Sequence, residues 1–245
     1  MATNNPEDLN VDLHKVEDKY FLDLSNYNDD ARYYNDYNFK KTEVAREGRS
    51  SQIYNKKTLA RLVGGCIVLN KSYDKVLMIS SSKHKTKWVF PKGGIEMDEL
   101  KNFKLTARRE TWEEAGVVGK ILRKLPVVED HRFQKPSKKE NLPSSSSSSS
   151  SSIDLRNEDG IKIPRSEFHF YEMEITELCD KWPEGDSRER KWCSYEEAKH
   201  ELHKSNRPEL LSSLNSSRIK KNRVVVKIDE HSNHIQDAEP QTDNY

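Results

Sequence analysis

Residues 91–117 read PKGGIEMDELKNFKLTARRETWEEAGV, and this stretch decides the fold class. Pro91 and the glycine pair Gly93 and Gly94 follow a short apolar run at 88–90, which is typical of a strand that stops at a turn. After the turn, apolar or small residues recur every four positions, as on the buried side of a helix: Phe103, Ala107, Thr111 and Ala115. Gly116 stands where helices commonly end. The stretch therefore predicts a strand, a glycine turn and a helix over about 100–115.

The predicted helix carries three glutamates on one face. Glu110, Glu113 and Glu114 fall within a sector of about 100° at the helical period. Carboxylates this close repel one another, and a divalent cation would reverse that cost because hard cations take carboxylate oxygens. Taken alone, a glutamate-rich helix is usually a solvated face and a glycine pair is an ordinary turn. Their conjunction is more specific.

Cationic residues precede the glycine turn in sequence: Lys83, Lys85, Lys87 and Lys92. Glycines at the turn would let a ligand approach the backbone closely. Metal ions on the glutamates would neutralise phosphate oxygens, and the lysines would hold further phosphates while water attacks phosphorus. The segment therefore indicates hydrolysis of a phosphate anhydride.

Apolar runs on both sides of this segment predict the rest of an α/β domain. Strands are expected at 62–69, 76–79, 88–90, 121–129, 167–175 and 190–195. Two helices should follow at 195–203 and 208–214, the second with Pro208 in its first turn.

The composition indicates that only part of the 245-residue chain is compact. Hydrophobic residues make up 33% of the chain, against about 45–50% in a typical globular domain, and charged residues 34%. We expect a disordered arm at 1–54, one domain at 55–216 and a polar tail at 217–245. A disordered insert is expected at 134–163, where nine serines run consecutively. Alternatively, the arm docks on the domain or on a partner through its tyrosines.

Charge and sequence patterns exclude several classes of protein. A net charge of +1 excludes a strongly basic nucleic-acid binder. No apolar run approaches the roughly 18 residues of a membrane span, so no membrane partner is expected. The N-terminus resembles no secretory signal, and three scattered cysteines suggest reduced thiols. We therefore expect a cytoplasmic protein that also enters the nucleus.

The segment resembles the Nudix box, which residues 93–99 match in its first half and residues 109–117 in its second. Nine residues instead of seven separate Glu99 from Arg109, so we infer a two-residue insertion before or at the start of the helix. From about residue 61 to 214 the chain is similar to the fungal diadenosine and diphosphoinositol polyphosphate phosphohydrolases, through the SSSKH run at 80–84, Arg190, Trp192 and Pro208 among others. This resemblance implies an α/β/α sandwich around a central mixed sheet, with a loop–helix–loop catalytic box.

The resemblance also implies roles for individual residues. Glu113 would be the catalytic base or a further metal ligand. Mg²⁺, or Mn²⁺ or another divalent cation, would be held by Glu110, Glu114, Glu113 and the carbonyl of Lys92. Arg109 and Glu99 would orient the glutamates. Substrate phosphates would contact Arg61, Ser81, Ser82, Lys83, Gly93, Gly94, Arg165, Arg188 and Arg207, although any one basic residue taken alone reads as a surface charge.

The implied function is a monomeric, metal-dependent pyrophosphohydrolase. It would remove the β-phosphate from inositol pyrophosphates and cleave diadenosine polyphosphates and inorganic polyphosphate. One alternative is mRNA decapping or hydrolysis of capped nucleotides, with capped RNA as the nucleic-acid partner. That activity would need a stacking aromatic residue, for which Trp88, Phe133 and Phe168 are candidates. Another alternative is a non-catalytic sensor or scaffold for phosphate-rich ligands.

Overall fold

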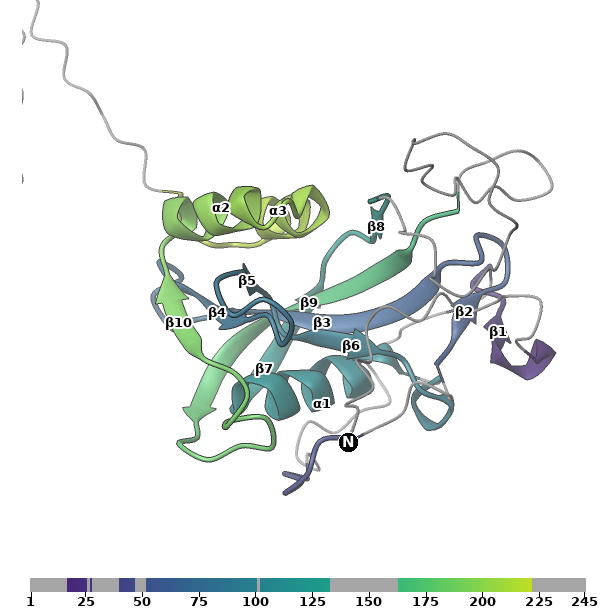
Figure 1. The fold of residues 1–245 in the computed structure, drawn as a ribbon, viewed down its shortest axis with the longest axis horizontal. Coiled ribbons are helices and arrows are strands. Elements are labelled where there is room, and N and C mark those ends of the chain that lie inside the picture. The colour runs from purple at the N-terminus through teal and green to yellow at the C-terminus, as the bar shows by residue number, and fades with distance from the viewer. Residues whose placement is uncertain are drawn as a thin grey trace, which may run out of the picture.

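The computed structural model describes residues 17–25, 27, 40–46, 52–100, 102–132 and 163–221. The described residues form a mixed sheet with helices on both faces (Figure 1), which confirms the expected α/β/α sandwich. Residues 134–162 of the expected serine insert, almost all of the polar tail and much of the arm at 1–54 lie outside the described residues.

The sheet is built around β3 (Arg61–Leu69), which is buried along nearly its whole length. β3 pairs in parallel with β9 (Ser166–Leu178) and antiparallel with its other partners, so the sheet is mixed. The remaining strands are β1 (Phe21–Leu22), β2 (Tyr54–Asn55), β4 (Val76–Ser80), β5 (Trp88–Val89), β6 (Lys92–Gly94), β7 (Val117–Lys124), β8 (Val128–Asp130) and β10 (Arg190–Cys193).

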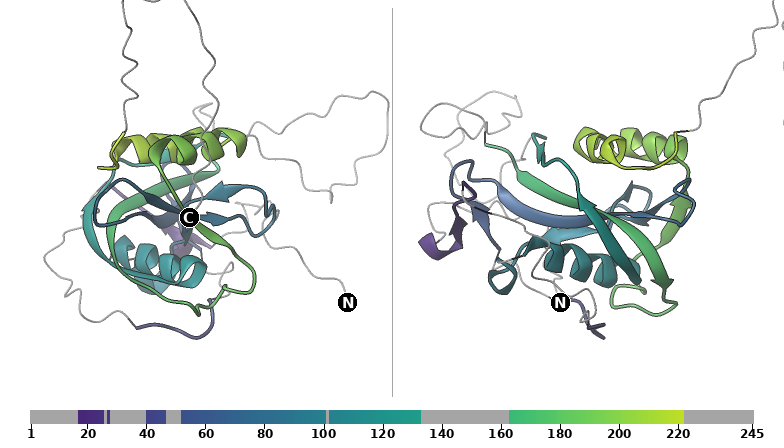
Figure 2. Two further views of the ribbon diagram at one scale, coloured as in Figure 1. Left: turned by 90° about the vertical axis from the view of Figure 1, so that its left-hand side faces the viewer. Right: turned by 180° about the vertical axis from the view of Figure 1, so that it is seen from behind.

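Helices cover the two faces of the sheet. Helix α1 (Phe103–Ala115) lies on one face, and α2 (Tyr195–Lys204) and α3 (Pro208–Ser216) lie together on the other (Figures 1 and 2). Short 3₁₀ turns precede β1 (η2, Asp18–Tyr20) and α1 (η6, Met97–Glu99). The predicted stripe of α1 is buried: Phe103, Ala107, Thr111 and Ala115 are each 0% exposed.

Helix α1 approaches the sheet closely because β3 carries a glycine beneath it. A Cβ at Gly64 would lie 3.0 Å from Cβ of Thr106 and 3.2 Å from the main-chain nitrogen of Ala107. The helix ends at Gly116, whose φ of 63° is the left-handed conformation that glycine adopts at little cost. The close contact at Gly64 sets the distance between α1 and the sheet, and the helix end at Gly116 sets where its last turn lies.

Several predicted elements differ from the structure. The glycine pair expected to form a turn lies in strand β6, which pairs antiparallel with β3, and neither Gly93 nor Gly94 has a positive φ. The expected strand at 121–129 is two strands, because Pro126, which lacks an N–H, interrupts the pairing with β9. The helix begins at Phe103 rather than near 100, because the Asn102 side chain accepts a hydrogen bond from the N–H of Lys104 and caps it there.

Three described pieces of the segment 1–54 contact the domain. Phe21 and Leu22 in β1 pair with β2. The ring of Tyr27 stacks on Phe103 at 4.2 Å between centroids, and its hydroxyl accepts a hydrogen bond from the N–H of Phe103. Residues 40–46 contact α1. The domain therefore has neighbours that precede residue 55.

Candidate active site

The loop before α1 is tied to the helix by Arg109. Nε of Arg109 donates to Oε1 of Glu99 at 2.7 Å, and its NH2 donates to Oε2 of Glu99 at 3.0 Å and to the carbonyl of Gly94 at 3.1 Å. The hydroxyl of Thr106 also donates to Glu99. The contact between Glu99 and Arg109 forms although nine residues rather than seven separate them in the sequence.

Arg109 keeps its charge inside this network. Burial works against the charged form, but hydrogen bonds and negative charge from Glu99, together with Glu110 and Glu113, raise the pKa of Arg109. A cation held this way fixes the helix relative to the glycine turn, which is the geometry that an orienting residue needs.

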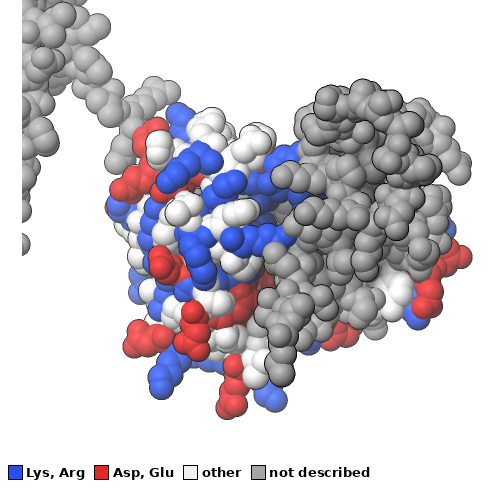
Figure 3. All heavy atoms as spheres, in the orientation of Figure 1, with Lys and Arg blue, Asp and Glu red and all other residues white. Residues whose placement is uncertain are grey.

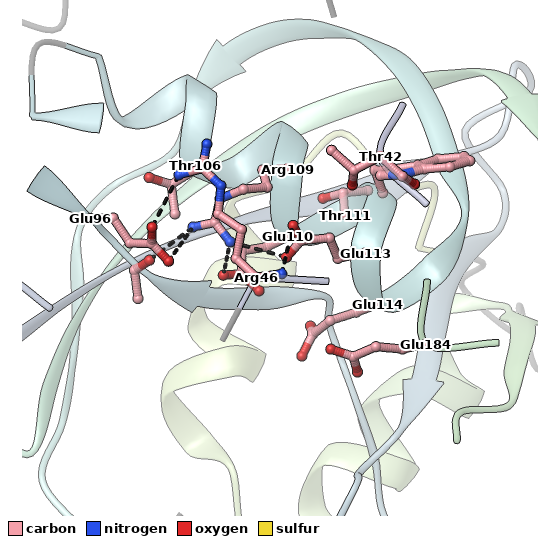
Figure 4. A network of polar contacts seen from close by, with 12 residues as sticks. Thr42, Arg46, Glu96, Thr106, Arg109, Glu110, Thr111, Glu113, Glu114 and Glu184 are labelled. Carbon is pink, nitrogen blue, oxygen red and sulfur yellow. Dashed lines mark hydrogen bonds and ion pairs between the residues drawn. The ribbon is translucent and has the colours of Figure 1, made fainter. Parts of the chain in front are cut away.

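The three glutamates lie on one side of α1, as Figure 4 shows. Glu110 pairs with NH1 of Arg109 at 2.7 Å, and Glu113 accepts from the same nitrogen at 3.1 Å. Glu114 accepts a hydrogen bond from the main-chain N–H of Lys92 at 2.7 Å and a second from Arg188. The helix thus presents carboxylates to β6, to Arg109 and to Arg188.

Negative charge accumulates where water is largely excluded. Burial raises the pKa of Glu110, and the charges of Glu114 and Glu113 raise it further against the effect of Arg109. Burial likewise raises the pKa values of Glu113 and Glu114. A carboxylate cluster of this kind gains from a bound cation, which would offset both the desolvation and the mutual repulsion.

The donor set fits a hard divalent cation. A Cβ at Gly93 would lie 2.0 Å from the carboxyl carbon of Glu110, so only glycine lets this carboxylate reach β6. In the antiparallel pairing of β6 with β3, the N–H of Cys66 donates to the carbonyl of Pro91. Hydrogen-bonded residues alternate along such a pair, so the next residue, Lys92, points its N–H and its carbonyl away from β3. Its carbonyl therefore lies on the same edge as the N–H that contacts Glu114. Oxygens of this type are what Mg²⁺ takes in proteins.

The carboxylates do not converge into a preformed cage. Within the described ranges, no three His, Cys, Asp or Glu side chains are gathered as closely as a bound ion requires. Instead Glu110 and Glu113 engage Arg109, and Glu114 engages Arg188. To bind a cation, these carboxylates would therefore have to leave their ion pairs with the arginines and turn toward the ion.

Glu184 is a site residue that sequence reasoning missed. It lies in the loop between β9 and β10, where its carboxylate accepts a hydrogen bond from Arg188 and its charge raises the pKa of Glu114. Its main-chain N–H bonds the carbonyl of Glu113 at 3.0 Å, and Figure 4 shows its side chain beside that of Glu114. The sequence signal was weak, an acidic residue four positions before Arg188 in a loop.

The β9–β10 loop brings a cation to the glutamates, and the β4–β5 loop lies against it. Arg188 joins them, since its NH1 donates to the carbonyl of Ser80 at 3.1 Å while its NH2 contacts Glu114. The β4–β5 loop, which holds Ser81, Ser82 and Lys83, also contacts the β9–β10 loop through a bond from Lys85 to the carbonyl of Ser187. Figure 3 shows lysine and arginine atoms gathered on this face, with acidic atoms in a hollow beside them.

The remaining predicted phosphate ligands lie farther along the sheet. A guanidinium nitrogen of Arg61 lies 3.0 Å from a Cβ built on Gly94, so Arg61 adjoins the glycine turn. The Arg207 guanidinium lies 5.8 Å over the ring of Phe168 and pairs with Glu209 on α3. Arg165 directly precedes β9, and its N–H donates to the carbonyl of Asp130 at the end of β8. Arg207 and Arg165 therefore belong to the β8 end of the sheet.

The aromatic candidates for base stacking are covered. The ammonium of Lys191 lies 4.2 Å from the ring centroid of Trp88. Phe168 is 3% exposed and packs on Phe170 beneath Arg207. Phe133 lies outside the described residues.

Comparisons with known proteins bear on this geometry. A family model described as the NUDIX domain matches residues 59–214. Nudix hydrolase 21, chloroplastic, of Arabidopsis thaliana is 31% identical over 159 residues, which cover 63% of this chain and 66% of that protein. Diphosphoinositol polyphosphate phosphohydrolase 3-alpha of Homo sapiens is 32% identical over 127 residues, which cover 51% of this chain and 58% of that protein.

The matched region spans about three fifths to two thirds of these curated relatives. Among solved structures, a C. elegans Ap4A hydrolase binary complex matches with 18% identity and a TM-score of 0.39, covering 62% of this chain and 92% of that chain. No helix in the described part of the chain is both long enough and apolar enough to cross a membrane.

Proposed function

The chain belongs to the Nudix family, and from this membership we propose that it is a metal-dependent pyrophosphohydrolase with phosphate-dense substrates. It removes the β-phosphate from inositol pyrophosphates, and it cleaves diadenosine polyphosphates and inorganic polyphosphate. The similarity to a human protein named as a diphosphoinositol polyphosphate phosphohydrolase supports the first of these substrates.

One observation carries the proposal, which is that a buried carboxylate cluster meets the main chain of β6 on one side and the cationic Arg188 of the β9–β10 loop on the other. Glu114 contacts both Lys92 at the glycine turn and Arg188 from the β9–β10 loop. The carboxylates suit a divalent cation, and the arginines and lysines suit phosphate, which arginine can bind through two hydrogen bonds at once. A polyanion with repeated anhydrides matches a site of this mixed charge.

The chain's own residues would divide the work as follows. Glu110, Glu114 and the Lys92 carbonyl would hold Mg²⁺ or Mn²⁺, which when bound neutralises phosphate oxygens. Glu113 would accept the proton of the attacking water. Arg109 would hold the glutamates in register with the glycine turn. Ser81, Ser82 and Lys83 would contact the phosphates that are not cleaved.

A product assay tests this function. The full chain is incubated with an inositol pyrophosphate or with diadenosine hexaphosphate, with Mg²⁺ and with excess chelator. We expect orthophosphate from the first substrate and shortened nucleotides from the second, both lost on chelation. Failure to hydrolyse either substrate in Mg²⁺ and Mn²⁺ would refute the proposal.

The role of Glu113 has its own test. Glu113→Gln keeps the shape of the side chain but cannot accept the proton, so turnover should fall by about 10²–10⁴-fold. Glu196→Gln, an exposed glutamate on α2, is the matched control and should leave turnover unchanged. Wild-type turnover in the Glu113 variant would remove Glu113 from the mechanism.

The covered aromatic rings favour this substrate class over capped RNA. Phe168 is buried, and Trp88 packs against the core with Lys191 over its ring, so stacking a base on either would require these contacts to be displaced. A capped RNA added to the product assay should be cleaved far more slowly than the inositol pyrophosphate.

The same assay tests the alternative of a non-catalytic sensor, which would bind the substrates without forming product. A cytoplasmic and nuclear location is part of the proposal, and imaging of the tagged chain tests it.

A further inference from the structure

Residues 40–46, here called the strap, lie against α1 although they precede the domain in sequence. Lys41 forms an ion pair with Glu177 at 2.6 Å, near the end of β9. The carbonyl of Thr42 accepts a hydrogen bond from Nε1 of Trp112 at 2.9 Å. Figure 4 shows Arg46 beside Glu113.

The strap contacts the proposed base directly. The main-chain N–H of Arg46 donates to Oε1 of Glu113 at 3.2 Å, while NH1 of Arg109 donates to Oε2 at 3.1 Å. Both oxygens of Glu113 are therefore engaged, and the side chain is only 2% exposed. A carboxylate held at both oxygens has one preferred orientation, which is what supporting hydrogen bonds provide to reacting groups.

The side chain of Arg46 fastens the strap to the loop before α1. Its NH1 lies 3.0 Å from an oxygen of Glu96 and 3.0 Å from an oxygen of Asp98. The Arg46 side chain is 42% exposed, and Val44 is 76% exposed. The strap is thus attached by polar contacts, of which the ion pairs of Lys41 and Arg46 are exposed and therefore weak, while the bonds to Trp112 and Glu113 are partly buried. The bond to Glu113 is the contact through which the strap can affect the reaction.

We infer that the strap is a positioning element, in which Arg46 holds Glu113 in its reactive orientation through its main-chain N–H. The inference rests on the proposed function, because it requires that Glu113 act in the reaction. Arg46 would not touch the substrate, so its loss should lower kcat and leave KM nearly unchanged.

Substitutions at one position separate the main chain from the side chain. Arg46→Pro removes the N–H together with the guanidinium, whereas Arg46→Ala removes only the guanidinium. Arg46→Pro should lower kcat by about tenfold or more, as other losses of an orienting partner do. Arg46→Ala should lose less, and Val44→Ala, which changes an exposed side chain of the same strap, should match the wild type.

The kinetic outcomes distinguish the strap from the function it serves. If Arg46→Pro and Arg46→Ala have equal kcat while Glu113→Gln is inactive, the strap inference alone is wrong. If Glu113→Gln is as active as the wild type, Glu113 is not the base and the strap inference loses its premise, whereas the proposed function fails only if the wild type hydrolyses neither substrate. A kcat above that of the wild type in Arg46→Pro would show that the strap obstructs the site, which also overturns the inference.

Amide hydrogen exchange provides a readout that needs neither metal nor turnover. In the full wild-type chain the Arg46 amide should exchange slowly, because its N–H is bonded to Glu113. Glu113→Ala removes the acceptor, so at a temperature where the variant is folded, exchange in peptides covering 40–46 should accelerate more than in other peptides of the domain. Unchanged exchange in this variant would overturn the inference even if Arg46→Pro did not fold.

Discussion

Replacing Gly93 with alanine tests whether the approach of Glu110 to the glycine turn matters for metal binding. In the structure a Cβ at this position would lie 2.0 Å from the carboxyl carbon of Glu110 and 2.1 and 2.2 Å from its oxygens. These distances are far inside van der Waals contact, so the Glu110 carboxylate must move away from β6 in the variant. Its place in the proposed ligand set would be lost.

The expected cost to stability is small. Gly93 does not have a φ in the left-handed range, so alanine fits its backbone, and replacing glycine reduces the entropy of the unfolded chain by about 0.4–1 kcal/mol. The displaced group is the far end of a flexible side chain, which costs about 1 kcal/mol to move. These terms nearly cancel, so the melting temperature should shift by no more than about 4 °C.

The loss of function should be much larger. We expect the Mg²⁺ concentration for half-maximal activity to rise by at least about tenfold, the lower end of the effect of losing a supporting residue at a metal site. The assay is an Mg²⁺ titration of pyrophosphate hydrolysis, paired with a thermal melt of the same preparation.

Gly64→Ala is the matched control for this variant. Its Cβ would press on Thr106 and on the main chain of α1 at 3.0–3.2 Å, which should cost about 1–3 kcal/mol of stability. Because this Cβ meets Thr106 and the main chain of α1 rather than a carboxylate, it should raise the Mg²⁺ concentration for half-maximal activity much less than Gly93→Ala does, at temperatures where the variant is folded. An unchanged Mg²⁺ dependence in Gly93→Ala would refute the reasoning, because the Glu110 carboxylate could then not be a ligand in its present position.

Two further predictions concern titration and thiol chemistry. Burial opposes the charged form of Asp130, but hydrogen bonds from Arg132 lower its pKa, so this carboxylate stabilises the fold above the unfolded pKa of about 3.9 and loses that effect as the pH falls through its folded pKa. Asp130→Asn should therefore be less stable by about 2 kcal/mol at pH 7, with the gap closing below about pH 4 in urea melts, and a gap independent of pH would contradict this. Burial raises the pKa of Cys66 to about 12 and that of Cys193 to about 11, whereas Cys179 is partly exposed, so iodoacetamide at pH 8 should label Cys179 first in the native chain. Peptide mass spectrometry that found Cys66 modified first would contradict the burial described.

Local sequence accounts for much of the fold and for the glutamate face. The stripe from Phe103 to Ala115 and the three glutamates follow from the helical period alone, because side chains three and four positions apart share a face. The C-terminal end at Gly116 follows from chirality, since glycine takes the left-handed conformation at little cost. Pro126 could also have been recognised locally as a strand break, because proline lacks an N–H, yet the apolar run around it led to the prediction of a single strand.

What the sequence determined by itself was therefore the catalytic-helix pattern, the family resemblance and the order of the strands and helices. Only the tertiary structure decided which distant residues meet that helix. Glu184 and Arg188 reach Glu114 from a loop about 70 residues later, and Arg46 reaches Glu113 from a segment 67 residues earlier. Such contacts depend on where the sheet places each loop, and no period or spacing encodes that position. The contact of Glu99 with Arg109 was likewise a matter of tertiary structure, because the loop before α1 had to absorb two extra residues for the ion pair to form.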